Sequence, residues 1–338
     1  MLALGTKSVG SLSSLGLIEL PEPEPGPGQV RVRVHAAAVN PADIKIVGGQ
    51  WAARFIHARV SPLVPGYDLS GVVDRVGEGV TDLAVGDAVF GHLPYRRTTR
   101  QGTWAQWITI DAEQIAPKPE GVEHATAAAA ATVGLTALQA LRDVARLQAG
   151  SRLLVLGASG GVGCLAVGIG KRLGARVTGV CSGYAVDFVR ELGAEAVIDR
   201  QTSDPLAPAE PFDVIFDTTG RYAYRACGRS LTRSGVFVTT MPSASFVLGK
   251  LSTMVGPRRC GVVMVASRRD DLQQLGRWIA QGMAVPVAQR VPVREAASAL
   301  KRLAGGGLLG KIALEVIDGL DDGTGKGAVS PESGARTP

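Results

Sequence analysis

Short segments of alternating hydrophobic and polar residues fill the first 124 positions of the chain. Stretches rich in Pro and Gly separate each segment from the next. This pattern predicts short β-strands joined by turns, in an irregular antiparallel barrel or sandwich. The predicted strands are residues 29–35, 69–76, 88–91 and 104–110.

From about Ala125 the pattern changes to short apolar segments that alternate with helical ones. This alternation predicts a doubly wound parallel sheet, and therefore an α/β fold. Its predicted strands are residues 152–156, 176–180, 196–198, 213–217 and 235–239. Beyond Ala266 the pattern predicts helices over 270–281 and 293–304 and a last strand over 312–317.

Composition places the chain among globular proteins. Of its 338 residues, 46% are hydrophobic and 20% are charged, and the net charge is +6. This is enough apolar material for a substantial core. Residues 319–338 differ, because they hold five glycines, two prolines and no aromatic residue. We expect this tail to be disordered.

Two charge-free stretches have nearly the length of a membrane span. Residues 125–141 are mostly Ala, and residues 153–170 contain six glycines, so neither composition favours a lipid-exposed helix. We therefore expect no membrane association. The N-terminal residues do not resemble a secretory signal, and the four cysteines show no paired spacing. We expect a cytoplasmic protein.

A glycine-rich loop follows the first strand of the predicted parallel sheet. Residues 153–156 form an apolar strand that leads into GASGGVG and then into a helical segment. Glycines permit a tight turn and close approach of the backbone to a pyrophosphate, which helix-terminal amides bind. The alternative is a glycine-rich corner without a ligand. The candidate coenzyme-binding residues are Gly157, Ala158, Ser159, Gly160, Gly161, Val162 and Gly163.

The second parallel strand ends without the acidic residue that NAD enzymes use for the ribose 2′-hydroxyl. Cys181 and Ser182 stand there, and no acid occurs between Val144 and Val186. A 2′-phosphate would accept a hydrogen bond from Ser182 and pair with Arg200 at the end of the next strand. This favours NADPH as the coenzyme. The alternative for Arg200 is an ordinary solvated charge.

Several motifs together resemble a known family. They are PEPGPGQVRVRVHAAAVNPADIK, VPGYDLSGVVDRVGEGV, VGDAVFG, GTWAQW, ATVGLTALQAL, GASGGVG, LGAEAVID and the pair GK. The chain resembles the zinc-independent quinone oxidoreductase (zeta-crystallin-like) branch of the medium-chain dehydrogenase/reductase superfamily.

The resemblance implies a chaperonin-10-like β-barrel catalytic domain over residues 1–124 and 266–318. It also implies a Rossmann NADP-binding domain over residues 125–265, a cleft between the two, and a homodimer. In zinc-dependent relatives, Cys, His and Cys hold a catalytic metal, whereas the corresponding positions here are Asn40, Tyr67 and about Thr132. The first 163 residues contain no Cys, so we expect no metal site.

The resemblance also implies which residues line the active site. Asn40, Asp43 and Lys45 would lie at the active-site end of the first domain. Asn40 would donate a hydrogen bond or simply form a turn, and Asp43 would cap the following turn. Lys45 would stabilise developing negative charge or remain solvated.

Four further residues are assigned in the same way. Tyr67 would donate to an oxyanion or be a buried, hydrogen-bonded phenol, and Trp51 would wall the substrate pocket or pack in the core. Thr136 would lie near the coenzyme carboxamide or bond its own helix backbone. Lys311, in the GK pair, is the last candidate coenzyme-binding residue.

Without a metal, hydride transfer needs an acceptor whose negative charge is delocalised. Quinones and α,β-unsaturated carbonyls meet this need, because hydrogen-bond donors can stabilise the resulting anion. The leading interpretation is a zinc-independent NADPH-dependent reductase of such compounds. One alternative is an enoyl-thioester reductase for carrier-bound intermediates, and another is a non-catalytic NADPH-binding protein.

A basic periodicity follows the fourth parallel strand. Arg221, Arg225, Arg229 and Arg233 recur every four residues, which predicts one basic helix face, more typical of a solvated surface than of a binding site. No recognised nucleic-acid module accompanies these residues, so we expect no nucleic-acid partner.

Overall fold

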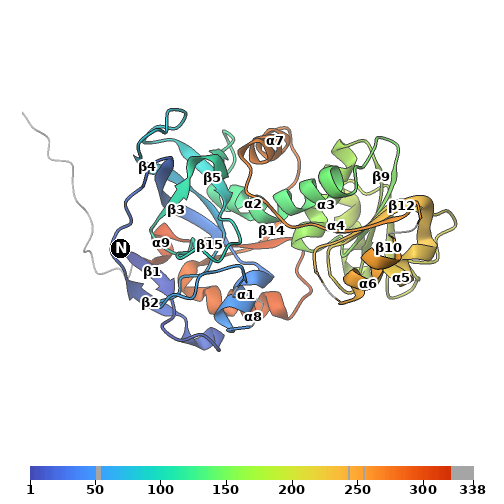
Figure 1. Cartoon of the computed structure of the whole chain (residues 1–338), viewed down its shortest axis with the longest axis horizontal. Helices are drawn as coiled ribbons and strands as arrows, with labels where there is room; N and C mark the ends of the chain where they lie inside the picture. The colour runs from blue at the N-terminus through green and yellow to red at the C-terminus, as the bar shows by residue number, and fades with distance from the viewer. Residues whose placement is uncertain (51–54, 243, 254–255, 321–338) are drawn as a thin grey trace, which may run out of the picture.

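Two lobes lie side by side along the longest axis of the molecule (Figure 1). The structure is a computed structural model that describes residues 1–50, 55–242, 244–253 and 256–320. Trp51 and residues 321–338 of the predicted disordered tail lie outside the described residues.

The first lobe is built on a mostly antiparallel sheet of seven strands. Its strand order is β14-β15-β3-β4-β5-β7, and β6 also pairs with β3. A separate hairpin joins β1 to β2. The strands are β1 (Leu2–Gly5), β2 (Gly16–Glu19), β3 (Gln29–Ala38), β4 (Asp68–Val76), β5 (Ala88–His92), β6 (Trp107–Asp111), β7 (Ile115–Pro117), β14 (Val287–Pro292) and β15 (Lys311–Glu315).

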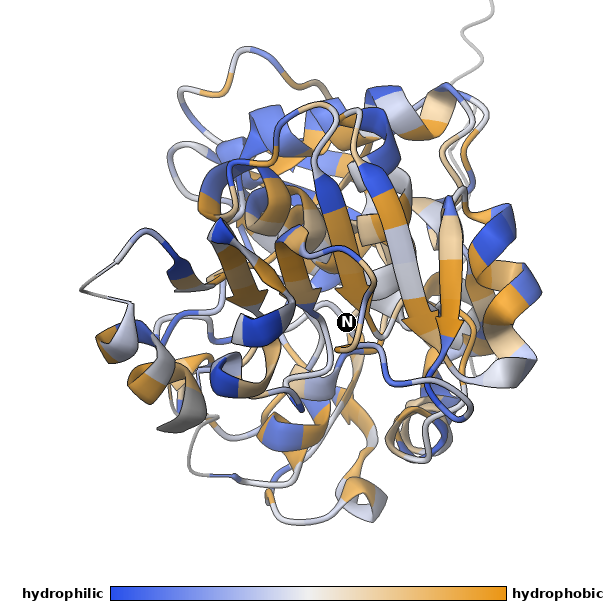
Figure 2. Cartoon of the chain, turned by 90° about the vertical axis from the view of Figure 1, so that its right-hand side faces the viewer, coloured by the Kyte–Doolittle hydropathy of each residue, from blue (hydrophilic) through white to orange (hydrophobic). Residues whose placement is uncertain are grey.

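The second lobe contains a parallel sheet of six strands in the order β10-β9-β8-β11-β12-β13. Figure 2 shows its strands side by side, largely hydrophobic, with helices packed against the sheet. This arrangement confirms the predicted parallel α/β sheet. The strands are β8 (Arg152–Leu156), β9 (Arg176–Cys181), β10 (Ala196–Asp199), β11 (Phe212–Asp217), β12 (Leu231–Thr239) and β13 (Arg259–Val262).

Helix α2 (His124–Gln139) packs against both lobes. Ala125 and Ala128 contact Ala36 and Ala313 of the first lobe in one buried cluster. Other residues of α2 share the core of the second lobe. The remaining helices are α1 (Pro41–Val47), α3 (Gly161–Arg172), α4 (Val186–Glu191), α5 (Tyr224–Cys227), α6 (Ala244–Ser252), α7 (Arg269–Ala280), α8 (Ala296–Ala304) and α9 (Ile317–Leu320).

Two expectations from the sequence are wrong. The arginines at 221–233 do not form one helix face, because α5 has only four residues and the chain is extended in β12 from Leu231. The tail is ordered at its first two residues, since Gly319 and Leu320 belong to α9 and Leu320 is buried in the first-lobe core.

A helix that crosses a bilayer must be long and predominantly apolar. Among the described helices, none combines enough residues with enough apolar character to do so.

Candidate functional site

Two positions of the glycine loop accept no residue other than glycine. Gly157, directly after β8, has φ +84°, and a Cβ there would lie 2.5 Å from Cγ2 of Thr219. A Cβ on Gly163 would lie 2.0 Å from the carbonyl oxygen of Gly157. The loop therefore turns tightly from β8 into α3, as a dinucleotide fold requires.

The first turn of α3 keeps its amide groups available. Its N-cap, Gly160, has no side chain to accept their hydrogen bonds, and the first turn contains no acid. Such a helix start attracts phosphate through free N–H groups and the helix dipole. The amide of Gly310 donates to the carbonyl of Ser159 at 3.0 Å, so the first lobe contacts this loop. Residues 159–163 therefore fit the pyrophosphate of a nicotinamide coenzyme.

Ser182 and Arg200 lie together at the ends of β9 and β10. Nε and Nη2 of Arg200 donate to Oγ of Ser182 at 3.1 and 2.9 Å. Cys181 is buried and presents no charge. The carboxylate of Asp199 also lies nearby, because a Cβ on Gly183 would be 2.8 Å from its Oδ2. This acid was missed in the sequence, since it is the last residue of β10 and does not stand at the end of β9, where NAD enzymes carry theirs.

Buried polar side chains meet where the first lobe faces α2. Nδ2 of Asn40 donates to Oδ2 of Asp68 at 2.7 Å, and the amide of Thr132 donates to Oδ1 of Asp68 at 2.6 Å. Nζ of Lys311 donates to Oδ1 of Asn40 at 2.6 Å and to the carbonyl of Val39 at 2.7 Å. Lys311 also lies 3.5 Å from Oδ2 of Asp68, so an ammonium compensates the buried carboxylate.

Lys311 links this cluster to the glycine loop. A Cβ on Gly161 would lie 2.8 Å from Cδ of Lys311, so the aliphatic part of the side chain passes along the loop. Its ammonium group, however, is directed to Asn40 and Asp68. The structure therefore places Lys311 between the two parts of the site.

Asp43 anchors the turn before α1. Its Oδ2 accepts from the amide of Asn40 at 2.7 Å, and its Oδ1 accepts from the amide of Gly66 at 3.1 Å. Burial raises the pKa of Asp43 to about 7, against the lowering effect of these donors. These contacts match the anchoring role predicted for Asp43, and both oxygens are occupied by backbone donors.

Lys45 reaches across the boundary between the lobes. Its Nζ lies 3.7 Å from Sδ of Met241, which follows β12 of the second lobe.

Thr136 points back to its own helix, with Oγ1 donating to the carbonyl of Thr132 at 2.7 Å. Thr136 therefore forms the hydrogen bond to its own helix backbone that was the alternative to a place near the coenzyme carboxamide.

Tyr67 does not present a free hydroxyl. Its side chain is fully buried, its hydroxyl donates to the carbonyl of Ile56 at 2.9 Å, and it lies 3.0 Å from Nδ1 of His57. Burial raises the pKa of Tyr67, so the phenol is neutral. The hydroxyl is committed to these partners and not to the cluster around Asp68.

Tyr95 is a further residue beside this cluster, and none of the sequence motifs indicated it. Its ring packs 4.3 Å from the ring of Tyr67 and 4.9 Å from that of His92. Burial, followed by the charges of Asp43 and Asp68, raises the pKa of Tyr95 well above its ordinary value. Its phenol therefore stays protonated beside the buried cluster. The only signal in the sequence was its place at the start of an arginine-rich loop.

The residues at the positions of a catalytic metal do not fit zinc. Asn40 is bonded to Lys311 and Asp68, and the hydroxyl of Tyr67 is bonded to Ile56. Amide and phenol oxygens are poor replacements for thiolate and imidazole. Within the described ranges, no three His, Cys, Asp or Glu side chains are grouped so as to hold a metal ion.

Two family models match the two parts of the chain. Residues 26–120 match the alcohol dehydrogenase GroES-like domain, and residues 192–314 match the zinc-binding dehydrogenase model. The first match confirms the expected chaperonin-10-like domain.

The chain is similar to two curated oxidoreductases. It is 31% identical over 311 residues to the trans-enoyl reductase pgmF of Aspergillus terreus, covering 85% of this chain and 86% of that protein. It is 37% identical over 203 residues to the mitochondrial NAD(P)H oxidoreductase RTN4IP1 of Homo sapiens. That match covers 55% of this chain and spans half the length of the human protein.

A solved structure has the same fold over nearly the whole chain. The quinone oxidoreductase from Coxiella burnetii superposes with a TM-score of 0.85 at 28% identity. The match covers 94% of this chain and 99% of that one.

Proposed function

The chain belongs to the medium-chain dehydrogenase/reductase superfamily, in its quinone oxidoreductase-like branch, and on this basis we propose that it is an NADPH-dependent reductase. Its substrates are quinones or α,β-unsaturated carbonyl compounds, and it acts without a metal. The observation that carries the proposal is the cluster of Asn40, Asp68 and Lys311, in which an amide at the first metal-ligand position is bonded to a buried carboxylate that an ammonium compensates.

The coenzyme is held by the second lobe. Amides of residues 159–163 bind its pyrophosphate, and Ser182 and Arg200 bind the 2′-phosphate. Asp199 is a nearby opposing charge, but the fixed contact between Arg200 and Ser182 favours the phosphate. When bound, the reduced nicotinamide supplies the hydride.

The first lobe stabilises the acceptor. One N–H of the Asn40 amide is bonded to Asp68, so the second N–H can donate to an oxygen of the acceptor. The neutral phenol of Tyr95 would be a second hydrogen-bond donor to the same oxygen. Such donors suit an enolate or hydroquinone anion, whose charge is already delocalised.

A second candidate function is reduction of an enoyl thioester. The observation that favours it is the similarity to the trans-enoyl reductase pgmF, which extends over most of both chains. The same donors would serve, because the thioester carbonyl also becomes an enolate after hydride addition.

One assay tests these functions together. Oxidation of NADPH is followed with 9,10-phenanthrenequinone, a small enone and an enoyl thioester as separate acceptors. Turnover with the quinone or enone supports the proposal, and a clear preference for the thioester supports the second candidate. Binding of NADPH without turnover of any acceptor would refute both proposed activities and would indicate a non-catalytic NADPH-binding protein.

A further inference from the structure

A second group of cations lies outside the coenzyme site. Residues 218–269 contain nine Lys and Arg residues but no Asp or Glu. The rest of the chain holds 27 Lys and Arg against 30 Asp and Glu. This one segment therefore carries more than the whole net positive charge of the protein.

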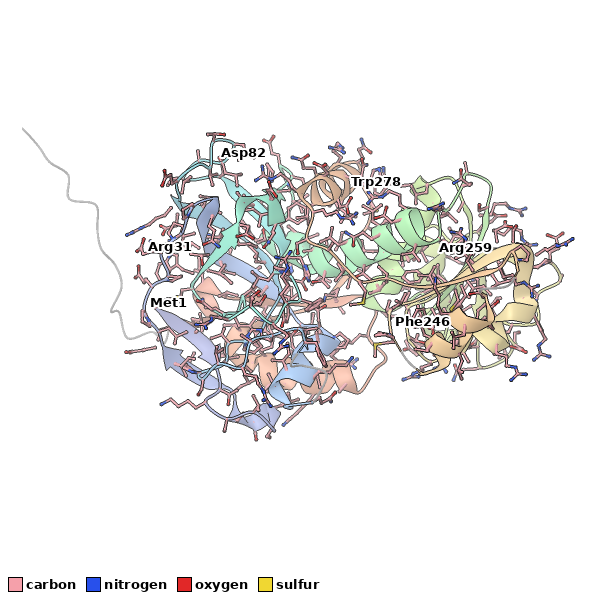
Figure 3. All side chains as sticks on the ribbon, viewed as in Figure 1. Met1, Arg31, Asp82, Phe246, Arg259 and Trp278 are labelled. Carbon is pink, nitrogen blue, oxygen red and sulfur yellow. The ribbon has the colours of Figure 1, made fainter. Side chains whose placement is uncertain are left out.

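Most of the segment lies at the outer edge of the second lobe, whereas Arg268 and Arg269 at its end pair with Asp143 and with Asp82 of the first lobe. Up to Val262 the segment forms α5, β12, α6 and β13, and β13 is the last strand of the sheet. Figure 3 shows Arg259 and Phe246 in this lobe, far from Met1. Arg233 lies near the start of β12, and Arg258 directly precedes β13.

This position is on the opposite edge of the sheet from the coenzyme. Gly157 and Ser182 follow the carboxyl ends of β8 and β9, whereas Arg233 and Arg258 lie near the amino ends of β12 and β13. All these strands are parallel, so their amino ends share the opposite edge. The two arginines therefore do not belong to the coenzyme site.

Arg233 and Arg258 line one hollow of about 420 Å³ together with Tyr224. Neither forms an ion pair with an Asp or Glu of the described residues, whereas nine other arginines do. Nε and Nη2 of Arg258 donate to the carbonyls of Thr232 and Leu231, both at 3.0 Å. These bonds fix the guanidinium group without neutralising it, and no hydrogen bond of the described residues occupies its Nη1.

At the C-terminal end of α6, beside this hollow, two side-chain hydroxyl groups weaken the repulsion that a bound anion would meet. Carbonyl groups at a helix C-terminus repel anions. Here Oγ of Ser252 donates to the carbonyl of Gly249 at 2.8 Å, and Oγ1 of Thr253 donates to that of Lys250 at 3.0 Å. These side chains reduce the repulsion. Burial raises the pKa of Tyr224, so its phenol is a donor as well.

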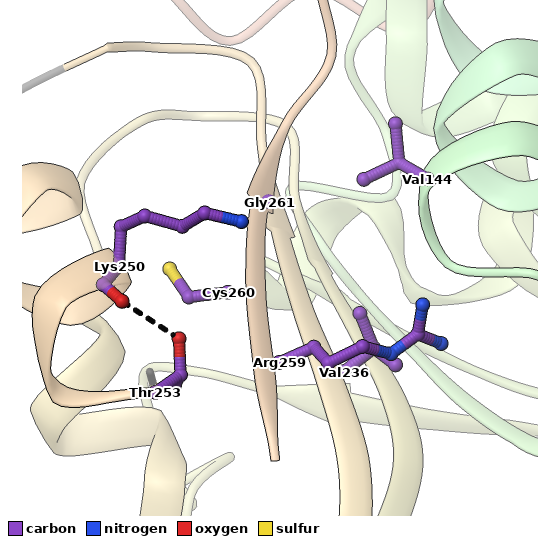
Figure 4. Close-up of a pocket in the computed structure, with 7 residues that line it drawn as sticks. All are labelled: Val144, Val236, Lys250, Thr253, Arg259, Cys260 and Gly261. Atoms are coloured by element: carbon purple, nitrogen blue, oxygen red, sulfur yellow. Dashed lines mark hydrogen bonds between the residues drawn. The ribbon is translucent and has the colours of Figure 1, made fainter. Parts of the chain in front are cut away.

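A neighbouring hollow of about 190 Å³ adds two more cations. It shares Thr253 with the first and is lined by Lys250 and Arg259. In Figure 4, Lys250 extends above Cys260 on the α6 side of β13, and Arg259 extends away from α6. Both raise the positive potential around the first hollow.

We propose that the hollow lined by Tyr224, Arg233 and Arg258 binds the phosphate group of a phosphorylated small molecule. Two guanidinium groups match the charge of a phosphate dianion, and their N–H groups match its oxygens. This site is additional to the NADPH site and lies across the sheet from it.

Isothermal titration calorimetry of the enzyme saturated with NADPH tests this site. Inorganic phosphate is the probe, with NaCl used to hold the ionic strength constant. Because the coenzyme occupies its own phosphate-binding groups, we expect saturable binding of one phosphate per chain. Arg233→Gln should weaken this binding at least about 10-fold, the loss of one charge-assisted hydrogen bond. Light scattering at each phosphate concentration separates binding from a change in oligomeric state.

Arg225→Gln is the matched control, because it removes the same charge from the exposed surface of α5, outside the hollow. We expect it to leave phosphate binding unchanged. Tyr224→Phe removes only a hydroxyl and provides a second test if Arg233→Gln does not fold; it should weaken binding several-fold. Absence of saturable binding, or equal losses in Arg225→Gln and Arg233→Gln, would overturn the proposal.

Discussion

The ammonium group of Lys311 lies 2.6 Å from Oδ1 of Asn40, although the two residues are 271 positions apart in the chain. The bond joins the start of β15 to the N-cap of α1. Through Asp68 it also involves the amide of Thr132 in α2. One buried cation therefore connects three elements at the active-site end of the first lobe.

Lys311→Met should destabilise the protein. The change leaves the fully buried carboxylate of Asp68 without its cation, and breaking a buried pair costs about 3–5 kcal/mol. Urea unfolding without coenzyme measures this loss. Lys301→Met, on the exposed side of α8, should change the free energy of unfolding by less than about 0.5 kcal/mol. Equal stability of the two variants would show that the cation is dispensable.

Arg200→Gln should remove the preference for NADPH. The guanidinium group is the only cation bonded to Ser182 among the described contacts, and its loss should weaken NADPH binding at least about 10-fold while NADH binding is retained. Fluorescence titration with both coenzymes measures the ratio. Arg190→Gln, which loses an exposed ion pair with Asp187, should leave the ratio unchanged. If wild type binds NADH more tightly, the NADPH assignment is wrong.

Tyr95→Phe should lower kcat and leave the ring packing intact. A donor to a developing oxyanion contributes about 10²–10³-fold to the rate, so a loss of this size is expected with a quinone or enone. Steady-state kinetics and the pH profile of kcat measure it. Tyr67→Phe is the control, because its hydroxyl donates to Ile56 and should affect stability more than kcat. An unchanged kcat for Tyr95→Phe would exclude its phenol from the reaction.

Buried histidines should make the protein acid-sensitive. Burial lowers the pKa values of His57, His92 and His124 to about 4 from 6.5. Between these values the unfolded chain binds protons that the folded protein does not, so stability falls as the pH drops from 6.5 to 4. His57 and His92 each contribute up to about 1.4 kcal/mol per pH unit in this range, and the partly exposed His124 contributes less. Asp43, with its raised pKa, opposes the effect, because its contribution falls as the pH rises from 3.8 towards 7.

Urea unfolding at pH 5 and pH 6 tests this dependence. In His92→Gln, the difference in unfolding free energy between the two pH values should shrink by about 1.4 kcal/mol. Ser267→Ala removes the hydroxyl bonded to Nδ1 of His92 but retains the titrating ring, so it should keep most of the difference. A wild-type protein equally stable at both pH values would contradict the prediction.

Gly163→Ala should disrupt the phosphate loop. The new Cβ would lie 2.0 Å from the carbonyl oxygen of Gly157, and relieving such a contact costs about 1–3 kcal/mol. NADPH affinity should fall as the loop shifts, measured by fluorescence titration. Gly168→Ala in the same helix meets only the flexible Met283 at 3.2 Å and should bind NADPH normally. Normal NADPH binding by Gly163→Ala would show that the loop tolerates a side chain.

Local patterns predicted much of the fold. The strand predicted over residues 152–156 coincides with β8, and the helix predicted over 270–281 is α7 shifted by one residue. Strands β1 and β14 were not predicted, because each is short and is held extended by pairing with another strand, β2 and β15 respectively. The prediction of one basic helix face over residues 221–233 was wrong for a similar reason. Pairing with β11 and β13 holds residues 231–239 extended despite their four-residue arginine spacing.

The site was predicted less completely than the fold. The glycine loop and the pair Ser182 and Arg200 follow from spacing within two successive βαβ units, from β8 to β10. The contacts of Lys311 with Asp68 and the position of Tyr95 depend on tertiary packing across separate strands. Sequence spacing carries no information about such contacts.

The alanine face of α2 sets a limit on how this protein can be divided. In a fragment that begins at residue 125, Ala125, Ala128 and Ala313 would lose their cover by Ala36, and the complementary fragment, residues 1–124, would expose Ala36 to water. Expressed separately, each half would expose an uncovered apolar surface and should aggregate. Mixed together, the two halves should recover solubility by reassembling along this helix.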